Sequence, residues 1–114
     1  MATSKSGEIW IAGAFLYSGR PEPTWPVSAA AAKRLQSLWA ALPATTEPAP
    51  NPSRLGYRGA FLRTSLHREW IAFGGLVSLK THAGIEVRAD GERQFERDLL
   101  ASAPKGLLPT DLSS

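Results

Sequence analysis

The 114-residue chain contains no cysteine and only two histidines, His67 and His82. The absence of thiols excludes disulfide bonds, thiolate metal sites and a cysteine nucleophile, and it is typical of a reducing compartment. The two histidines do not form a His-x-His or His-x-x-x-His spacing, so the sequence predicts no metal site. Long apolar runs are missing as well, because the most apolar stretch, residues 9–17, is far shorter than the roughly 20 residues that span a bilayer. We therefore expect a cytoplasmic protein that does not enter membranes.

Groups that commonly make or break bonds are scarce. The serines do not occur in a Gly-x-Ser-x-Gly elbow, and no glycine run between a strand and a helix is suited to bind a phosphate. Glu92 and Glu96 are one helical turn apart, but their charged neighbours indicate an exposed helix face. The sequence thus predicts no catalytic residues and no cofactor. One catalytic alternative stays open, a small enzyme or enzyme subunit that uses His67, His82 or Glu69 as acid and base groups.

Charge is distributed unevenly, although the net charge is only +3. Residues 20–68 contain seven basic and two acidic side chains, which gives +5. Residues 69–114 contain five basic and seven acidic side chains, which gives −2. Such a distribution can attract an acidic partner to the middle of the chain, or favour the association of two copies by charge complementarity. The alternative is an ordinary solvated surface.

Hydrophobic periodicity predicts several strands and two helices. Residues 8–17 are β-branched and aromatic, which is typical of a central strand, and Gly13 among them indicates a bulge or a close backbone approach. Prolines make residues 20–26 extended, close to polyproline II, and unable to join a sheet. An amphipathic helix is expected from the N-cap Ser28 to Leu42. Four further strands are predicted at residues 57–64, 69–73, 76–81 and 85–88.

The last helix is predicted from the N-cap Asp90 to Ala103. The element order β-α-β-β-β-β-α indicates an α+β fold of two layers, with a mostly antiparallel sheet of four to five strands and two helices on one face. One domain is expected over residues 8–104, between a disordered N-terminus at residues 1–7 and a flexible tail at residues 105–114. Residues 43–53 are rich in proline and are predicted to form a mobile surface loop.

Two segments contain more arginine and aromatic residues than packing alone requires. Residues 18–25 hold an arginine and a tryptophan on a proline-stiffened scaffold, and residues 55–59 hold a tyrosine and an arginine between glycines. These residue types dominate binding hot spots. In the structural alternative, the tryptophan fixes the first helix and the arginines pair with Glu22 or a backbone carbonyl. The predicted ligand-binding residues are Arg20, Trp25, Tyr57 and Arg58.

Residues 54–63 interleave basic and aromatic side chains, as the strands of RNA-binding sheets do. Their aromatic spacing departs from the ribonucleoprotein motif, and the acidic second half of the chain would repel a phosphate backbone. RNA binding is therefore an alternative, and nucleic acid is not the expected partner.

Three motifs resemble those of a group of small, mostly uncharacterised single-domain proteins of bacteria and fungi. They are Ser-Gly-Arg-Pro-x-Pro-x-Trp at residues 18–25, Leu-Gly-Tyr-Arg-Gly at 55–59 and Asp-x-x-Arg-x-x-Glu-x-x-Leu-Leu at 90–100. The resemblance covers residues 8–103, although the group has Asn in place of Glu22 and an aromatic residue in place of Ala60. It implies no catalytic residues. In size the chain is also similar to accessory proteins that act beside enzymes of ribosomal-peptide biosynthesis, as in crocagin-like pathways.

These observations favour a function in binding over catalysis. We expect a non-enzymatic accessory module that binds a peptide or protein partner, by strand addition to a sheet edge and through the four predicted residues. We also expect it to form a homodimer.

Overall fold

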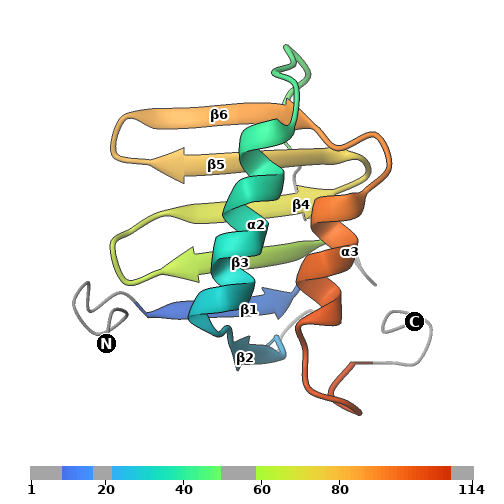
Figure 1. The fold of residues 1–114 in the computed structure, drawn as a ribbon. Coiled ribbons are helices and arrows are strands. Elements are labelled where there is room, and N and C mark those ends of the chain that lie inside the picture. Colours follow the sequence, from blue (N-terminus) through green and yellow to red (C-terminus); the bar gives the residue numbers. More distant parts are fainter. Residues whose placement is uncertain (1–8, 17–21, 50–58, 109–114) are drawn as a thin grey trace.

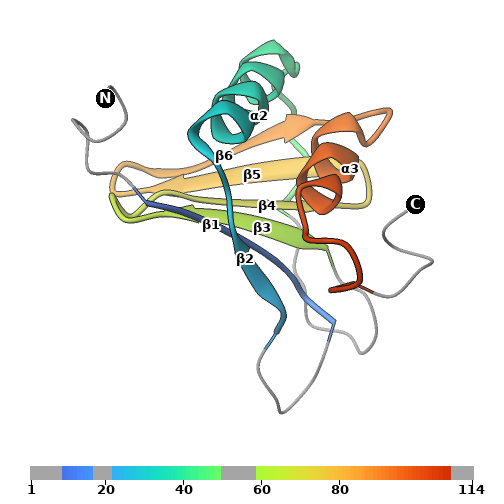
Figure 2. The same cartoon turned by 60° about the horizontal axis from the view of Figure 1, so that its bottom comes forward.

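The computed structural model describes residues 9–16, 22–49 and 59–108. Its strands form one antiparallel sheet in the order β2-β1-β3-β4-β5-β6, and both helices cover the same face of that sheet (Figures 1 and 2). The α+β class and the placement of both helices on one face are confirmed, with one strand more than predicted. The elements are β1 (Trp10–Ala14), β2 (Thr24–Pro26), α2 (Ala29–Ala41), β3 (Ala60–Thr64), β4 (Glu69–Phe73), β5 (Leu76–Thr81), β6 (Gly84–Ala89) and α3 (Gln94–Ala101).

The additional strand is β2, which lies in the proline-rich segment that was predicted to be unable to pair. That prediction is wrong because β2 is an edge strand, and an edge strand needs hydrogen bonds on one side only. Pro23 still accepts a hydrogen bond through its carbonyl, from the N–H of Ala14 at 3.2 Å. Val27 donates to the carbonyl of Trp10 at 3.0 Å. Pro26, which has no N–H, is tolerated between these two bonds.

Helix α2 begins where the sequence predicts. The Ser28 hydroxyl accepts a hydrogen bond from the N–H of Ala31 at 3.1 Å, which caps the first turn. The face that packs on the sheet buries Ala32, Leu35 and Trp39. Because these residues recur at helical spacing, the amphipathic pattern alone determined the position of this helix.

Helix α3 begins at Gln94, three residues later than the predicted N-cap Asp90 would place it. The chain first makes a turn in which Arg93 adopts a left-handed conformation, with φ of 57°. The Asp90 carboxylate still accepts hydrogen bonds from the N–H groups of Phe95 and Glu96, at 3.4 and 3.3 Å. Glu96 is only 1% exposed, so the predicted exposed helix face is wrong for this residue.

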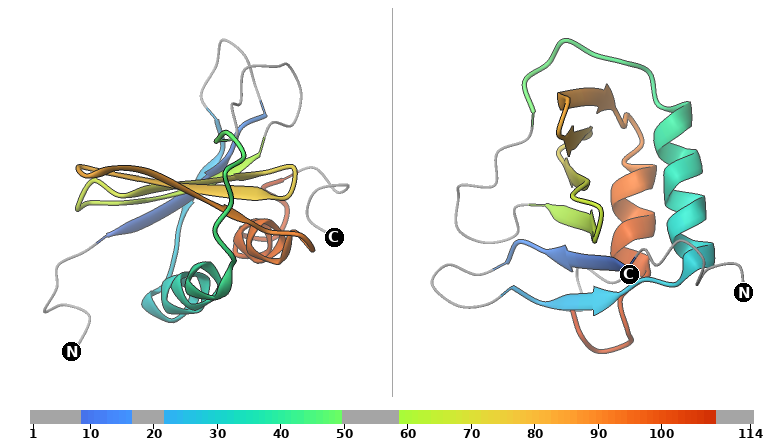
Figure 3. Two further views of the ribbon diagram at one scale, coloured as in Figure 1. Left: turned by 90° about the horizontal axis from the view of Figure 1, so that it is seen from above. Right: turned by 90° about the vertical axis from the view of Figure 1, so that its left-hand side faces the viewer.

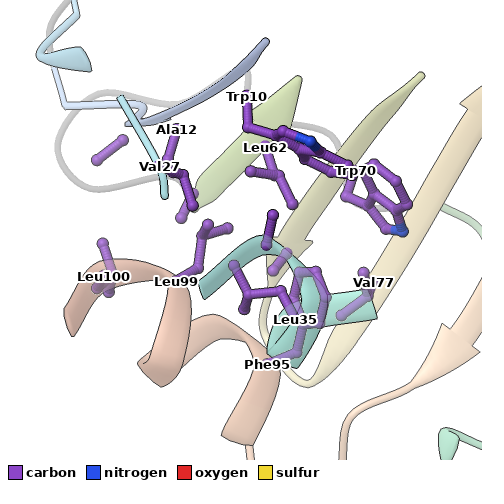
Figure 4. Close-up of a cluster of buried hydrophobic side chains, with 14 of the residues drawn as sticks. Trp10, Ala12, Val27, Leu35, Leu62, Trp70, Val77, Phe95, Leu99 and Leu100 are labelled. Carbon is purple, nitrogen blue, oxygen red and sulfur yellow. The ribbon is translucent and has the colours of Figure 1, made fainter. Parts of the chain in front are cut away.

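The hydrophobic core lies between the sheet and the two helices (Figure 4). Trp10 and Trp70 stack within it, with ring centroids 5.8 Å apart. The cluster extends to Leu108, which is 5% exposed and lies beyond the expected domain end at residue 104. No helix among the described residues is both long and apolar enough to span a bilayer.

The start of the predicted mobile loop is attached to the sheet. The carbonyl of Pro43 accepts a hydrogen bond from the N–H of Ala89 at 2.8 Å, and the N–H of Thr45 donates to the carbonyl of Val87 at 3.2 Å. Residues 43–45 therefore cover the second half of β6. The predicted disordered N-terminus, residues 1–7, lies outside the described residues.

Candidate binding pocket at the hairpin tips

Two β-hairpins lie side by side at one end of the sheet, on the left in Figure 1, because β4 and β5 are neighbours. The register of these strands pairs Glu69 with Lys80. Two residues beyond that pair, His67 and His82 face each other from the two turns, with ring centroids 5.8 Å apart. The fold thus brings together the two histidines of the sequence.

An open pocket of about 450 Å³ lies at these hairpin tips. Three of the side chains that line it are cationic and one is a carboxylate, in addition to the two imidazoles. This excess of positive charge favours anions over cations as ligands. The lining residues are Arg63, Thr64, His67, Arg68, Glu69, Lys80, Thr81 and His82.

Arg68 is held against the end of the hydrophobic core. Its guanidinium lies 5.4 Å from the ring centroid of Trp10 and 5.3 Å from that of Trp70. Both indoles are buried, at 9% and 2% exposure, so they form a rigid support for the cation. A guanidinium fixed in this way loses little conformational entropy when it binds a ligand.

Glu69 and Arg63 neutralise each other across β3 and β4. The Nε of Arg63 is 2.6 Å from Oε2 of Glu69, and its guanidinium lies 4.1 Å from the ring centroid of Phe61. Lys80 is the opposite neighbour of Glu69 in the sheet, is exposed, and forms no salt bridge within the described part of the chain. Lys80 is therefore a cation of the pocket that is placed to meet an incoming anion.

The structure describes one of the four predicted ligand-binding residues, Trp25. Trp25 is 2% exposed, and its indole N–H donates to the Ser102 hydroxyl at 2.9 Å. This geometry favours a packing role for Trp25, with its indole bonded at the end of α3. Arg20, Tyr57 and Arg58 lie outside the described residues.

Sequence reasoning missed the pocket although the sequence contains a signal for it. Gly74 and Gly75 both have positive φ, 63° and 86°, as a tight two-residue hairpin turn requires. Such a turn fixes the register, and His67 and His82 are equally distant from its centre. Counting outward from the glycine pair would have matched the two histidines.

The described residues contain no group of three or more histidine, aspartate and glutamate side chains arranged to hold a metal ion. Comparison with protein families, curated proteins and solved structures finds no match for this chain. The resemblance indicated by the three sequence motifs therefore stays a prediction.

Both edges of the sheet offer little backbone to a partner strand. β2 has three residues, one of them Pro26. The second half of β6 is covered by residues 43–45, which leaves the short stretch from Gly84 to Glu86. Among the described residues, the pocket is thus the better developed feature for recognition.

Proposed function

We propose that this protein is a non-enzymatic binding module whose pocket at the hairpin tips takes an acidic group of a peptide or protein partner. The observation that carries the proposal is the pocket with three cationic side chains and one carboxylate, in which that carboxylate is already paired with Arg63. Recognition by side chains in this pocket replaces the strand addition that the sequence suggested.

The expected affinity is modest and depends on salt. Ion pairs in contact with solvent contribute about 0.2–1 kcal/mol each, and the pocket is open. Salt screens such pairs, with a Debye length of about 10 Å at 0.1 M. Binding should therefore weaken steadily as sodium chloride is added.

Calorimetric titration with a short glutamate-rich peptide tests the proposal. We expect Lys80→Ala to weaken binding about fivefold, since one exposed ion pair is lost. Lys33→Ala is the matched control, because Lys33 is an exposed lysine on α2, far along the chain from the pocket, and it should leave the affinity unchanged. An absence of binding heat, or equal affinities of the two variants, would contradict the proposal.

An acid–base enzyme is the second candidate, and the meeting of His67 and His82 in one pocket favours it. Glu69 is less suited to proton transfer, because its carboxylate is bonded to Arg63. The enzyme hypothesis predicts turnover of a substrate by the purified protein and its loss in His67→Gln and His82→Gln. The binding hypothesis predicts that both variants retain most of the peptide affinity.

RNA binding receives less support. Base stacking needs accessible ring faces, whereas Phe61, the described aromatic residue of the segment 54–63, is 1% exposed. A steep dependence of RNA affinity on salt, measured on a nucleic-acid column, is the result that would restore this candidate.

The proposal also includes a homodimer, a cytoplasmic location and an accessory role in the biosynthesis of a ribosomally made peptide. The dimer is supported by the opposite net charges of the two parts of the chain, and the location by the absence of cysteine. The accessory role is supported by the size of the chain.

Analytical ultracentrifugation tests the dimer and should give the mass of two chains. A monomer at high micromolar concentration contradicts the dimer.

A further inference from the structure

The two histidines at the hairpin tips face each other, and both line the pocket. His67 lies in the turn between β3 and β4, and His82 lies in the turn between β5 and β6. Their rings meet edge to face, with 62° between the ring planes, and both residues are exposed. Viewed from the end of the sheet at which these turns lie, both helices are on one side of the strands (Figure 3, right). A ligand can therefore reach both imidazoles from solvent.

The backbone of His67 is in a conformation that favours glycine. Its φ is 65°, in the left-handed region, and its N–H donates to the carbonyl of Thr64 at 3.2 Å. A hydrogen bond from the N–H of Thr64 to the carbonyl of Arg68 closes the loop. Hairpin loops of this kind normally have glycine at the left-handed position after the turn. A side chain there costs stability, and residues held in this way cluster at binding and active sites. The imidazole of His67 therefore has a role other than forming the turn.

One oxygen of an anion fits between the two rings. A charge-assisted N–H···O hydrogen bond is about 2.8 Å long, so an oxygen bonded to an imidazole lies about 4 Å from the ring centroid. The centroids of His67 and His82 are 5.8 Å apart, which is less than twice that distance. A single carboxylate oxygen can thus accept hydrogen bonds from both imidazoles once the exposed side chains rotate towards it.

Protonation of the histidine pair adds positive charge to the pocket. Imidazole is the side chain that changes charge between about pH 5 and pH 8, and its protonated form has two N–H donors. The charged groups around the pair, among the described residues, are Arg63, Arg68, Glu69 and Lys80. Glu69 is bonded to Arg63, and Lys80 adds a positive charge on the same side. A bound anion therefore offsets the repulsion between the protonated imidazoles and Lys80.

We propose that the acidic group of the partner is bound between His67 and His82 in their protonated form, with Lys80 beside them, so that binding takes up protons and strengthens as the pH falls. Binding and protonation are linked, because a ligand that prefers the protonated pair also stabilises the protons on it. This inference rests on the proposed function of the pocket. It adds the groups that hold the ligand and the condition that controls its binding.

Titration calorimetry with the glutamate-rich peptide at about pH 8 and about pH 6 tests the inference, since glutamate stays ionised at both. Each additional ion pair strengthens binding about two- to fivefold, so we expect roughly fivefold tighter binding at the lower pH. The double variant His67→Gln with His82→Gln should keep most of the affinity at the higher pH and gain nothing at the lower pH. Titrations in two buffers of different ionisation enthalpy should show net proton uptake that the double variant loses.

Glu69 is a competing source of pH dependence. Protonation of its carboxylate would free Arg63 and also strengthen anion binding at low pH. Glu69→Gln removes that source, because an amide does not titrate, and this variant should keep the full gain at the lower pH. A gain that disappears in Glu69→Gln and persists in the double histidine variant contradicts the inference.

His67→Gly separates the imidazole from the fold of the turn. Glycine adopts a φ of 65° without strain, so the melting temperature should not fall, while part of the gain at the lower pH is lost. Retention of the whole gain by this variant contradicts the inference. His82→Gln alone keeps the test valid if a change at His67 destabilises the turn, and thermal melts identify such a case.

The outcomes distinguish the two proposals. Equal affinities at the two pH values would overturn the role of the histidines and leave the pocket for an acidic group intact. An absence of binding at both pH values overturns both proposals. Tighter binding at the lower pH that the double variant retains also overturns the inference, because other groups then take up the protons.

Discussion

The two faces of the sheet are made by the same strands, but their side chains have different environments. Under the helices, alternate residues such as Ala12, Leu62, Trp70 and Val77 are at most 2% exposed and belong to the core. On the opposite face the alternate residues are charged at the hairpin tips and uncharged beyond them. The comparison indicates that the helix side forms most of the core, whereas the opposite face buries Phe61 and Ser78 and exposes charged side chains at the hairpin tips.

The largest expected difference between the faces is in stability. Leu62→Ala on the helix side should lower the free energy of unfolding by about 2–5 kcal/mol, because it opens a cavity in a fully buried site. Leu76→Ala is the same substitution on the opposite face, where the side chain is half-buried. It should lower the free energy of unfolding by less than half as much. Urea denaturation measures both. Equal losses would show that the second face is packed like the first.

The next effect concerns Gly13, where the sequence predicted a bulge or a close backbone approach and the structure instead shows regular pairing under the Phe61 side chain. A Cβ atom at this position would lie 2.2 Å from Cζ of Phe61. We expect Gly13→Ala to destabilise the protein by about 1–3 kcal/mol through overpacking. The double variant Gly13→Ala with Phe61→Ala should lose less stability than the sum of the losses of the two single variants. Gly91→Ala is the control, because no atom lies within 4 Å of a Cβ built there.

A smaller effect on stability is expected at the contact between Trp25 of β2 and Ser102 at the end of α3. The hydrogen bond from the Trp25 indole to the Ser102 hydroxyl joins the edge strand to the end of α3. A double-mutant cycle of Trp25→Phe and Ser102→Ala, followed by thermal denaturation, should give a coupling of about 1 kcal/mol. A coupling near zero would mean that Trp25 acts through its buried ring alone.

The smallest effect on stability is expected at the ion pair between Arg63 and Glu69, on the face opposite the helices. Glu69→Gln removes an ion pair with Arg63, whose side chain is 51% exposed, and should cost about 0.2–1 kcal/mol. The same change frees Arg63 and should strengthen binding of a glutamate-rich peptide, by about two- to fivefold for one additional ion pair. Glu92→Gln, an exposed site at the start of the α3 region, should change neither quantity. Weaker peptide binding by Glu69→Gln contradicts this role of Arg63.

Local patterns in the sequence were enough to predict much of the fold. The spacing of Leu35 and Trp39 and the cap at Ser28 gave the boundaries of α2, and alternation with turn signals gave the hairpins of β3 to β6. The edge strand β2 was missed because the prolines were interpreted without knowing that the strand would need hydrogen bonds on one side only. The start of α3 was misplaced because Asp90 caps the helix across an intervening turn.

The candidate site was harder to predict, because it depends on contacts between distant parts of the chain. The sequence left open whether Trp25 binds a ligand or packs in the core, and its hydrogen bond to Ser102 favours packing. His67 and His82 are each unremarkable in a turn, and only the order of β4 beside β5 joins them.

The most direct test of a binding pocket at the hairpin tips is a titration of ¹⁵N-labelled protein with a glutamate-rich peptide, followed by backbone amide chemical shifts. The account predicts that the largest changes occur at residues 67–69 and 80–82. Changes concentrated on α2 and α3, or no saturable change at all, would contradict it.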